Sequence, residues 1–263
     1  MRRSARATYL YCLVEWEISF PAVAAAGAPE GLPGASPPRT VDLGDGLALV
    51  ASDVPLPDYA AEAIEERLAD LEWVSARALA HERVVEHFAA AGTVLPFQLF
   101  TLFTDEARAK ADVAGRRPQI ARTLERLRGA REWGVRIAFD PAAAPGAAGS
   151  GAADGDGAAV SGRAFLLHKK RRQEAGRELA QSAERAVEAL YQALAGQARA
   201  ARRREPMPEA GARLLLDATF LVPRTAATAF EAALAGGTGD LAACGCEATL
   251  TGPWPPYSFV EET

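Results

Sequence analysis

Apolar and polar positions along the chain predict a mixture of strands and helices. Residues 9–14 are apolar at consecutive positions, which is typical of a central strand covered on both faces. Residues 47–50 predict a second buried strand, and Asp45-Gly46 before it is a hairpin turn signal. Residues 93–103 are rich in strand formers but contain Pro96, so we expect an edge or a bulge there.

Helical spacing dominates the chain between these strands. Ile64, Leu68 and Leu71 begin a pattern that continues to Ala91, which predicts one helix that ends at Gly92. Asp105 is a suitable cap for a second helix over 106–128. Residues 135–139 alternate and predict a half-buried strand. Residues 1–140 therefore form an expected N-terminal α+β domain with a mostly antiparallel sheet.

The second half of the chain begins after a segment of low complexity. Residues 141–162 are nearly all Ala, Gly, Ser, Pro and Asp, which predicts a flexible linker. Residues 163–263 form the expected C-terminal α+β domain. Its predicted elements are a long helix over 163–204 with an apolar stripe, a strand over 214–222, a helix over 226–234 and a strand over 244–250. The Pro-rich tail 252–259 should lie extended, with Trp254, Tyr257 and Phe259 packed on the protein.

Charge is concentrated in the long helix. The whole chain has a net charge of −5, which argues against a nucleic-acid coating protein. The helix carries two basic clusters, Lys169–Arg172 and Arg202–Arg204. A solvated helix face is the simplest interpretation, and docking onto an acidic protein surface is the main alternative. Nucleic acid is the weakest alternative, because no aromatic residues lie between the basic ones.

Short motifs that suggest catalysis or metal binding are incomplete. His81-Glu82 resembles the start of a zinc-protease motif, but position 85 is Val. Cys244 and Cys246 have no second pair of ligands, so core thiols are expected. Residues 154–157 lack most of a calcium loop, and residues 236–239 lack the Lys of a phosphate loop, so a linker and a turn are expected there. We therefore expect no enzyme, no metal and no cofactor.

The chain also lacks the signals of a membrane or secreted protein. The apolar run that ends at Val14 is too short for a secretory signal, and the acid-free stretch between Glu86 and Asp105 is broken by Gly92 and Pro96. Three cysteines make no even disulfide framework. A reduced, cytoplasmic protein without membrane contact is expected.

Six motifs, in order and spacing, resemble the GvpL/GvpF gas vesicle protein family from about Tyr9 to Phe259. The family usually has an Arg and a Gly where this chain has Gln98 and Phe100. Because Phe cannot adopt the special backbone angles of Gly cheaply, we expect the backbone to differ locally there. The motifs are Leu71-Glu72-Trp73, His81-Glu82-x-Val84-Val85, Gly92–Pro96, Arg131–Val135, Gly162–Leu167 with Lys169–Arg171, and Leu250–Phe259.

The resemblance implies a non-enzymatic, cytoplasmic protein that helps to build gas vesicles. Members of the family are accessory or minor structural components, thought to bind the small hydrophobic shell protein and other accessory proteins. The implied fold is two α+β domains, the first a modified ferredoxin-like sandwich. A ligand-binding or catalytic protein that uses the cleft between its domains is the alternative function.

The residues that we expect to contact the shell protein come from both domains. The aromatic residues of the first domain lie near its family motifs. Apolar patches rimmed by charged residues suit contact with a hydrophobic partner. The basic cluster of the long helix should add a secondary, salt-screened contribution. The predicted partner-binding residues are Trp73, Phe97, Phe100, Phe103, Lys169, Lys170, Arg171 and Arg172.

Overall fold

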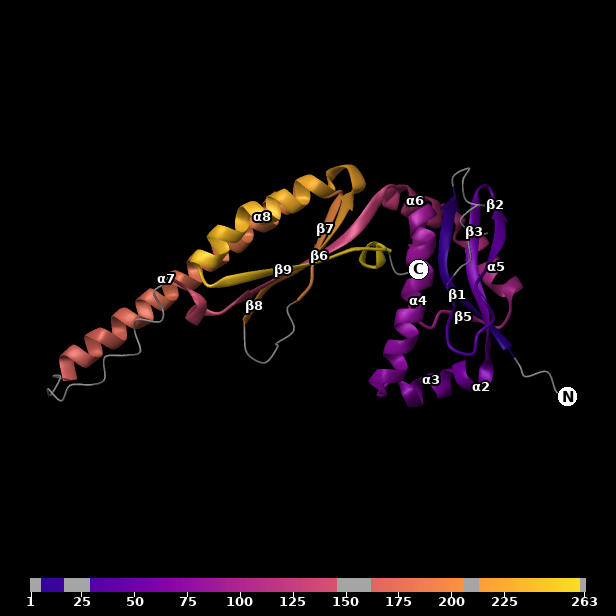
Figure 1. The fold of residues 1–263 in the computed structure, drawn as a ribbon, viewed down its shortest axis with the longest axis horizontal. Coiled ribbons are helices and arrows are strands. Elements are labelled where there is room, and N and C mark those ends of the chain that lie inside the picture. The colour runs from indigo at the N-terminus through magenta and orange to yellow at the C-terminus, as the bar shows by residue number, and fades with distance from the viewer. Residues whose placement is uncertain (1–5, 17–28, 146–161, 206–212, 261–263) are drawn as a thin grey trace. The chain divides into compact units, whose positions relative to one another are not determined.

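The computed structural model describes residues 6–16, 29–145, 162–205 and 213–260 (Figure 1). Their contacts divide the chain into two units. The first unit takes its residues from Met1–Arg131 and Trp254–Thr263, and the second takes them from Glu132–Pro253. Each unit combines one sheet with helices, so the predicted α+β class is confirmed.

The first unit contains a five-stranded sheet in the order β2-β3-β1-β4, and β5 also pairs with β1. The predicted hairpin turn is confirmed, because Asp45 and Gly46 have φ values of 54° and 74° and connect β2 to β3. The sequence analysis did not predict β2. The strands are β1 Arg6–Trp16, β2 Arg39–Gly44, β3 Leu47–Pro55, β4 Gly92–Pro96 and β5 Leu102–Phe103.

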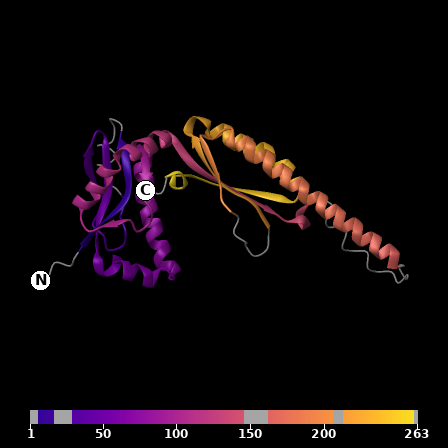
Figure 2. The same cartoon turned by 180° about the vertical axis from the view of Figure 1, so that it is seen from behind.

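Strand β1 is the centre of this sheet, as its sequence predicted. Every residue from Tyr9 to Val14 is fully buried, and β1 pairs with β3 on one side and with β4 and β5 on the other. Helix α4 (Leu71–Ala91) packs along one face of the sheet in both views (Figures 1 and 2). Its residues Val85 and Phe88 join the buried cluster that contains Tyr9 and Tyr11.

Helix breaks divide both of the long helices predicted for this unit. After the short helix α2 (Leu56–Tyr59), the first prediction becomes α3 (Ala61–Arg67) and α4, since the Asp70 side chain accepts a hydrogen bond from the Trp73 amide at 3.0 Å and caps a new helix. The second becomes α5 (Glu106–Gly115), capped by Asp105 as predicted, and α6 (Arg117–Leu127). Pro118 in the first turn of α6 favours a fresh helix start.

The ferredoxin-like description of the first unit stays a prediction. The observed strand order agrees with it. The connection between β1 and β2, where such a fold has its first crossover helix, includes residues 17–28, which lie outside the described residues.

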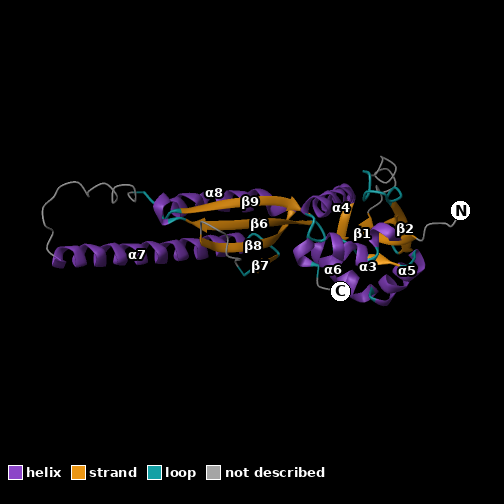
Figure 3. Ribbon diagram, turned by 90° about the horizontal axis from the view of Figure 1, so that it is seen from below, coloured by secondary structure: helices purple, strands orange, loops and turns teal. Residues whose placement is uncertain are grey.

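The second unit contains a four-stranded sheet in the order β7-β8-β6-β9, with helices α7 and α8 on one face (Figure 3). Its core joins alternate residues of β6, including Trp133 and Ile137, to the apolar stripe of α7 and to Phe230 of α8. The elements are β6 Ala130–Phe139, α7 Gly162–Ala195, β7 Ala200–Arg203, β8 Arg213–Pro223, α8 Ala227–Ala243 and β9 Cys246–Trp254.

Two predictions for this unit are wrong. The long helix ends at Ala195, so the second basic cluster lies on and beside the short strand β7 instead of on a helix. Residues 236–239 form no turn, because they lie inside α8. Close packing explains the glycine at position 237, because a Cβ atom there would lie 2.8 Å from Cδ1 of Leu190 on α7.

The limits of the two units also differ from the predicted boundaries. Strand β6 was assigned to residues 1–140, yet its apolar row is central to the second core. The tail from Trp254 was assigned to the C-terminal domain, yet it belongs to the first unit. In the predicted linker, Pro141–Ala143 forms a short 3₁₀ turn and Ala144 is buried. Residues 146–161 lie outside the described residues.

Candidate partner-binding surface

Trp73 and Phe100, two of the predicted partner-binding residues, form a stacked pair. Asp70 fixes Trp73 in the first turn of α4, and Phe100 lies in the connection between β4 and β5. Their ring centroids are 5.5 Å apart, with 26° between the planes. The Arg77 guanidinium lies 3.8 Å from the Trp73 ring centroid, which is a cation–π contact. Both rings of the stack stay partly exposed, so the pair can still contact a partner.

Phe100 corrects the expectation of a locally different backbone. Its φ is 67°, which is the left-handed region that glycine favours. Such a conformation costs a non-glycine residue about 1–3 kcal/mol, and the stacking on Trp73 offsets part of that cost. The Phe100 amide also lies 3.4 Å from the Tyr9 hydroxyl, to which it donates.

Phe97 and Phe103, the other two predicted aromatic residues, lie on the wall of a cleft in the first unit. The cleft has a volume of about 760 Å³. Phe97 is buried and Phe103 is partly exposed. The end of β4, helix α5 and the C-terminal tail supply its lining, which consists of Pro96, Phe97, Gln98, Thr101, Phe103, Asp112, Arg116, Tyr257, Ser258 and Val260.

A buried polar cluster lies between α4 and the sheet. The Tyr9 hydroxyl is 2.7 Å from Nδ1 of His81, and the Tyr257 ring from the tail is 6.2 Å from the His81 ring, centroid to centroid. Burial lowers the pKa of His81 to about 4, so this imidazole is neutral at pH 7. Burial also raises the pKa of Tyr257. His81 is therefore a packing residue, whereas its incomplete motif left capping and packing open as its structural roles.

The basic cluster Lys169–Arg172 lies on α7, which belongs to the second unit. The four predicted aromatic residues belong to the first unit. All four side chains are exposed, and Lys170 forms a loose ion pair with Glu174 at 3.8 Å. The predicted apolar stripe of α7 (Leu179, Ala183, Val187, Leu190 and Leu194) is confirmed, because four of its residues are buried in the second core and Leu179 packs against it. The described side chains from Leu166 to Glu178 are all exposed.

The second basic cluster is engaged within its own unit. Arg203 forms an ion pair with Glu188 at 2.6 Å and lies 3.7 Å from the centroid of the Tyr191 ring. Arg204 lies 3.9 Å from the buried carboxylate of Glu132. These contacts join β7 to α7 and to β6, so this cluster stabilises the second unit.

The exposure of three leucines in or just before α4 was not predicted from the sequence. Leu68, Leu71 and Leu79 are 55%, 78% and 58% exposed. Leu68 and Leu71 had been assigned to the buried stripe of one long helix, which was wrong because Asp70 starts a new helix between them. Leu71 and Leu79 are eight residues apart in α4, so they lie on the same side of it. The cap at Asp70, followed by a fresh phase of the apolar pattern, was the available signal.

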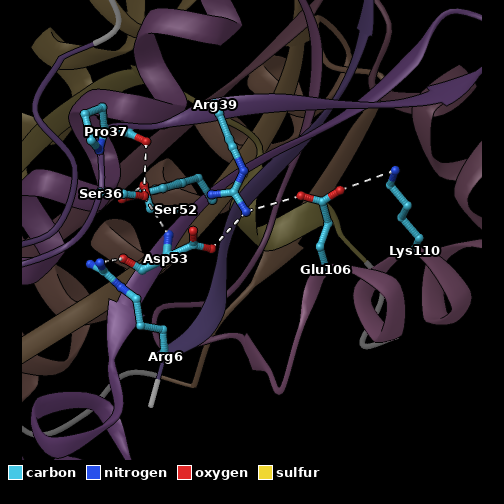
Figure 4. Close-up of polar contacts among 9 residues, drawn as sticks. Arg6, Ser36, Pro37, Arg39, Ser52, Asp53, Glu106 and Lys110 are labelled. Carbon is cyan, nitrogen blue, oxygen red and sulfur yellow. Dashed lines mark hydrogen bonds and ion pairs between the residues drawn. The ribbon is translucent and has the colours of Figure 1, made fainter. Parts of the chain in front are cut away.

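A polar network on the surface of the first unit is structural (Figure 4). The Arg39 guanidinium of β2 lies 2.8 Å from Asp53 of β3 and 3.2 Å from Glu106 of α5, and Lys110 lies 3.4 Å from Glu106. All four side chains are more than a third exposed, which makes these modest surface pairs. They tie the edge strand β2 to its neighbours.

The described residues offer little for metal or membrane chemistry. Within 6–16, 29–145, 162–205 and 213–260, no group of three His, Cys, Asp or Glu side chains could hold a metal ion. No helix in these ranges is long and apolar enough to cross a membrane. Cys12 and Cys246 are buried free thiols, as expected, and Cys244 is free and partly buried.

A family model described as "Gas vesicle synthesis protein GvpL/GvpF" matches residues 7–261. The chain belongs to the GvpL/GvpF family. "Gas vesicle protein L" of Streptomyces sp. (strain CB03234) is 32% identical over an alignment of 243 residues, and the match covers 88% of this chain and 86% of that protein.

Two solved structures of gas vesicle protein GvpF have the same fold as this GvpL/GvpF-family chain. The protein from Anabaena sp. PCC7120 matches with a TM-score of 0.68 and 18% identity, over 98% of this chain and 97% of that one. The protein from Microcystis aeruginosa matches with a TM-score of 0.65 and 16% identity, over 97% and 99%. The resemblance inferred from the motifs is thus confirmed, and it links the chain to gas vesicles.

Proposed function

We propose that this chain is an accessory or minor structural protein of gas vesicle assembly, and that it binds the small hydrophobic shell protein without catalysing a reaction. It acts in the cytoplasm and at the gas vesicle, where other accessory proteins are further partners. Membership of the GvpL/GvpF family supports the gas vesicle role. The exposed leucines of the first unit are the observation that favours a hydrophobic partner.

The main contact lies in the first unit. Leu71 and Leu79 offer apolar surface on the outer side of α4, and Leu68 lies just before that helix. The Trp73–Phe100 stack offers a rigid aromatic surface, and the cleft beside Phe97 and Phe103 can accept an apolar side chain. Exposed apolar side chains of this size gain free energy when a partner covers them.

The basic residues Lys169–Arg172 contribute a smaller, long-range attraction. Their side chains are exposed on α7, so their interaction with an acidic partner surface is screened by salt. Charge reversal of the four residues should weaken binding at low salt and change it little at high salt.

The test is capture of co-expressed shell protein by the tagged full-length chain. Leu71→Asp with Leu79→Glu places charge on the outer side of α4. The acid introduced at position 71 suits a helix N-terminus, and the one introduced at position 79 can pair with Arg83, four residues further along the helix, so folding is preserved. Ala114→Glu with Ala121→Glu adds the same charge at exposed sites of α5 and α6 and is the control.

We expect the wild type and the alanine-site control to capture the shell protein, and the leucine variant to lose at least about tenfold in affinity. If the wild type captures none, binding of the shell protein is rejected. If the leucine variant binds as well as the control, the contact lies elsewhere on the chain.

A further inference from the structure

The two edges of the second sheet differ in how they are protected from other strands. Edge strand β7 has four residues, of which Arg202 and Arg203 are exposed cations. Short length and positive charge are common protections of a sheet edge. Edge strand β9 has nine residues, and Glu247 is its only charged one. Among the described residues, β9 pairs with β6 alone, so its outer edge is long and nearly uncharged.

Strand β9 alternates between half-buried residues on one face and exposed residues on the other. The Asp140 amide donates to the Gly245 carbonyl at 2.8 Å, and the Thr251 hydroxyl lies 3.5 Å from the Gly134 carbonyl, so β9 runs antiparallel to β6. Ala248 and Leu250 pack at the margin of the second core, whereas Thr249 and Thr251 are exposed on the other face. A further strand beside β9 would extend both faces.

The neighbouring side of α8 can accommodate another helix. Figure 3 shows α8 on the β9 side of the sheet and α7 on the β7 side. Gly237 faces α7. The residues that point away from α7 include Ala235, Thr238 and Ala242, all small and exposed, and the exposed Glu231 at the start of the same row. Small residues allow two helices on one sheet to lie close together.

We propose that a second copy of this chain pairs with β9, antiparallel and about a two-fold axis at Leu250, the midpoint of the strand. This register places Thr249 opposite Thr251 of the second copy, Ala248 opposite Gly252, and Glu247 opposite Pro253. No charge meets a like charge, and Thr–Thr pairs are favourable across strands. The two four-stranded sheets then become one continuous sheet, with α8 beside its own symmetry mate.

Sedimentation equilibrium on the full-length chain tests this pairing with two matched variants. Thr249→Lys with Thr251→Lys puts like charges opposite each other across the axis twice. Thr249→Lys with Thr251→Glu puts opposite charges there, at the same exposed positions. Circular dichroism confirms that each variant keeps the fold.

We expect the wild type to reach twice its 27.7 kDa mass with rising concentration. The Lys/Lys variant should raise the dimer dissociation constant by about tenfold or more, and the Lys/Glu variant should keep or tighten the dimer. A wild type that stays monomeric up to its solubility limit overturns the proposal. The proposal is also overturned if the dimer dissociation constant is unchanged in both variants, or if it is raised equally in both. Protection of β9 amides only on addition of shell protein would assign the edge to that protein instead.

Discussion

The C-terminal tail offers a sharp test of how the first unit is held together. Phe259 in the tail is 1% exposed, and the Phe259 carbonyl accepts a hydrogen bond from the Arg126 guanidinium of α6 at 2.6 Å. Trp254, at the start of the same tail, is 44% exposed. The sequence analysis expected all three tail rings to pack. In the structure Phe259 is the buried anchor, and the half-exposed Trp254 provides a comparison within the same tail.

Phe259→Ala should lower the free energy of unfolding by about 3–5 kcal/mol, which is the usual cost of removing a buried phenyl ring and leaving a cavity. Trp254→Ala should cost about 2 kcal/mol or less, because Trp254 is 44% exposed and its removal leaves no closed cavity. The Phe259 main-chain bond to Arg126 is retained in the variant, so the difference reports ring burial.

Urea denaturation of the full-length chain, followed by circular dichroism, measures both values. The midpoint should fall by more for Phe259→Ala than for Trp254→Ala, with similar slopes. If Phe259→Ala lies within about 1 kcal/mol of the wild type, or if both variants lose equally, the tail is not anchored through that ring.

Three further predictions concern other parts of the chain. The pKa of His81 is about 4 in the folded state and 6.5 in the unfolded state. The free energy of unfolding should therefore fall as the pH drops from 6.5 toward 4, by about 2 kcal/mol at pH 5. A His81→Asn variant that keeps the same pH dependence in urea denaturation would refute this. Gly236→Ala should stabilise α8 by about 0.5–1 kcal/mol, whereas Gly237→Ala should gain less or lose, because its Cβ meets Leu190; equal melting shifts would contradict that contact. Deletion of residues 146–159 should leave the free energy of unfolding within about 1 kcal/mol, whereas deletion that also removes Ala144 should cost more, and calorimetry distinguishes the two.

Local patterns predicted the elements of the fold better than their grouping into units. The run from Tyr9 to Val14 identified the central strand, because consecutive apolar residues need cover on both faces. The alternation in β6 identified a strand, but it carried no information about which sheet the strand joins. The return of the tail to the first unit likewise depends on contacts between distant residues, such as Phe259 with Arg126.

The candidate surface was predictable only in part for the same reason. Aromatic residues near the motifs pointed to the first unit, and the structure brings Trp73 and Phe100 together. The amino-acid sequence did not show that Phe97 would be buried, or that the cap at Asp70 would turn the Leu71 side chain toward solvent. A one-residue change in helix phase moves a side chain by about 100°, so small errors in helix limits exchange core and surface.

Restoration of gas vesicles in living cells tests the proposed function most directly. In a gas-vesicle-forming host that lacks this gene, electron microscopy counts vesicles after return of the wild type, the Leu71→Asp/Leu79→Glu variant, or the Ala114→Glu/Ala121→Glu control. We expect the wild type and the control to restore vesicles and the leucine variant, though folded and present at normal levels, to fail. Normal vesicles without the gene, or full restoration by the leucine variant, would contradict an assembly role exercised through α4.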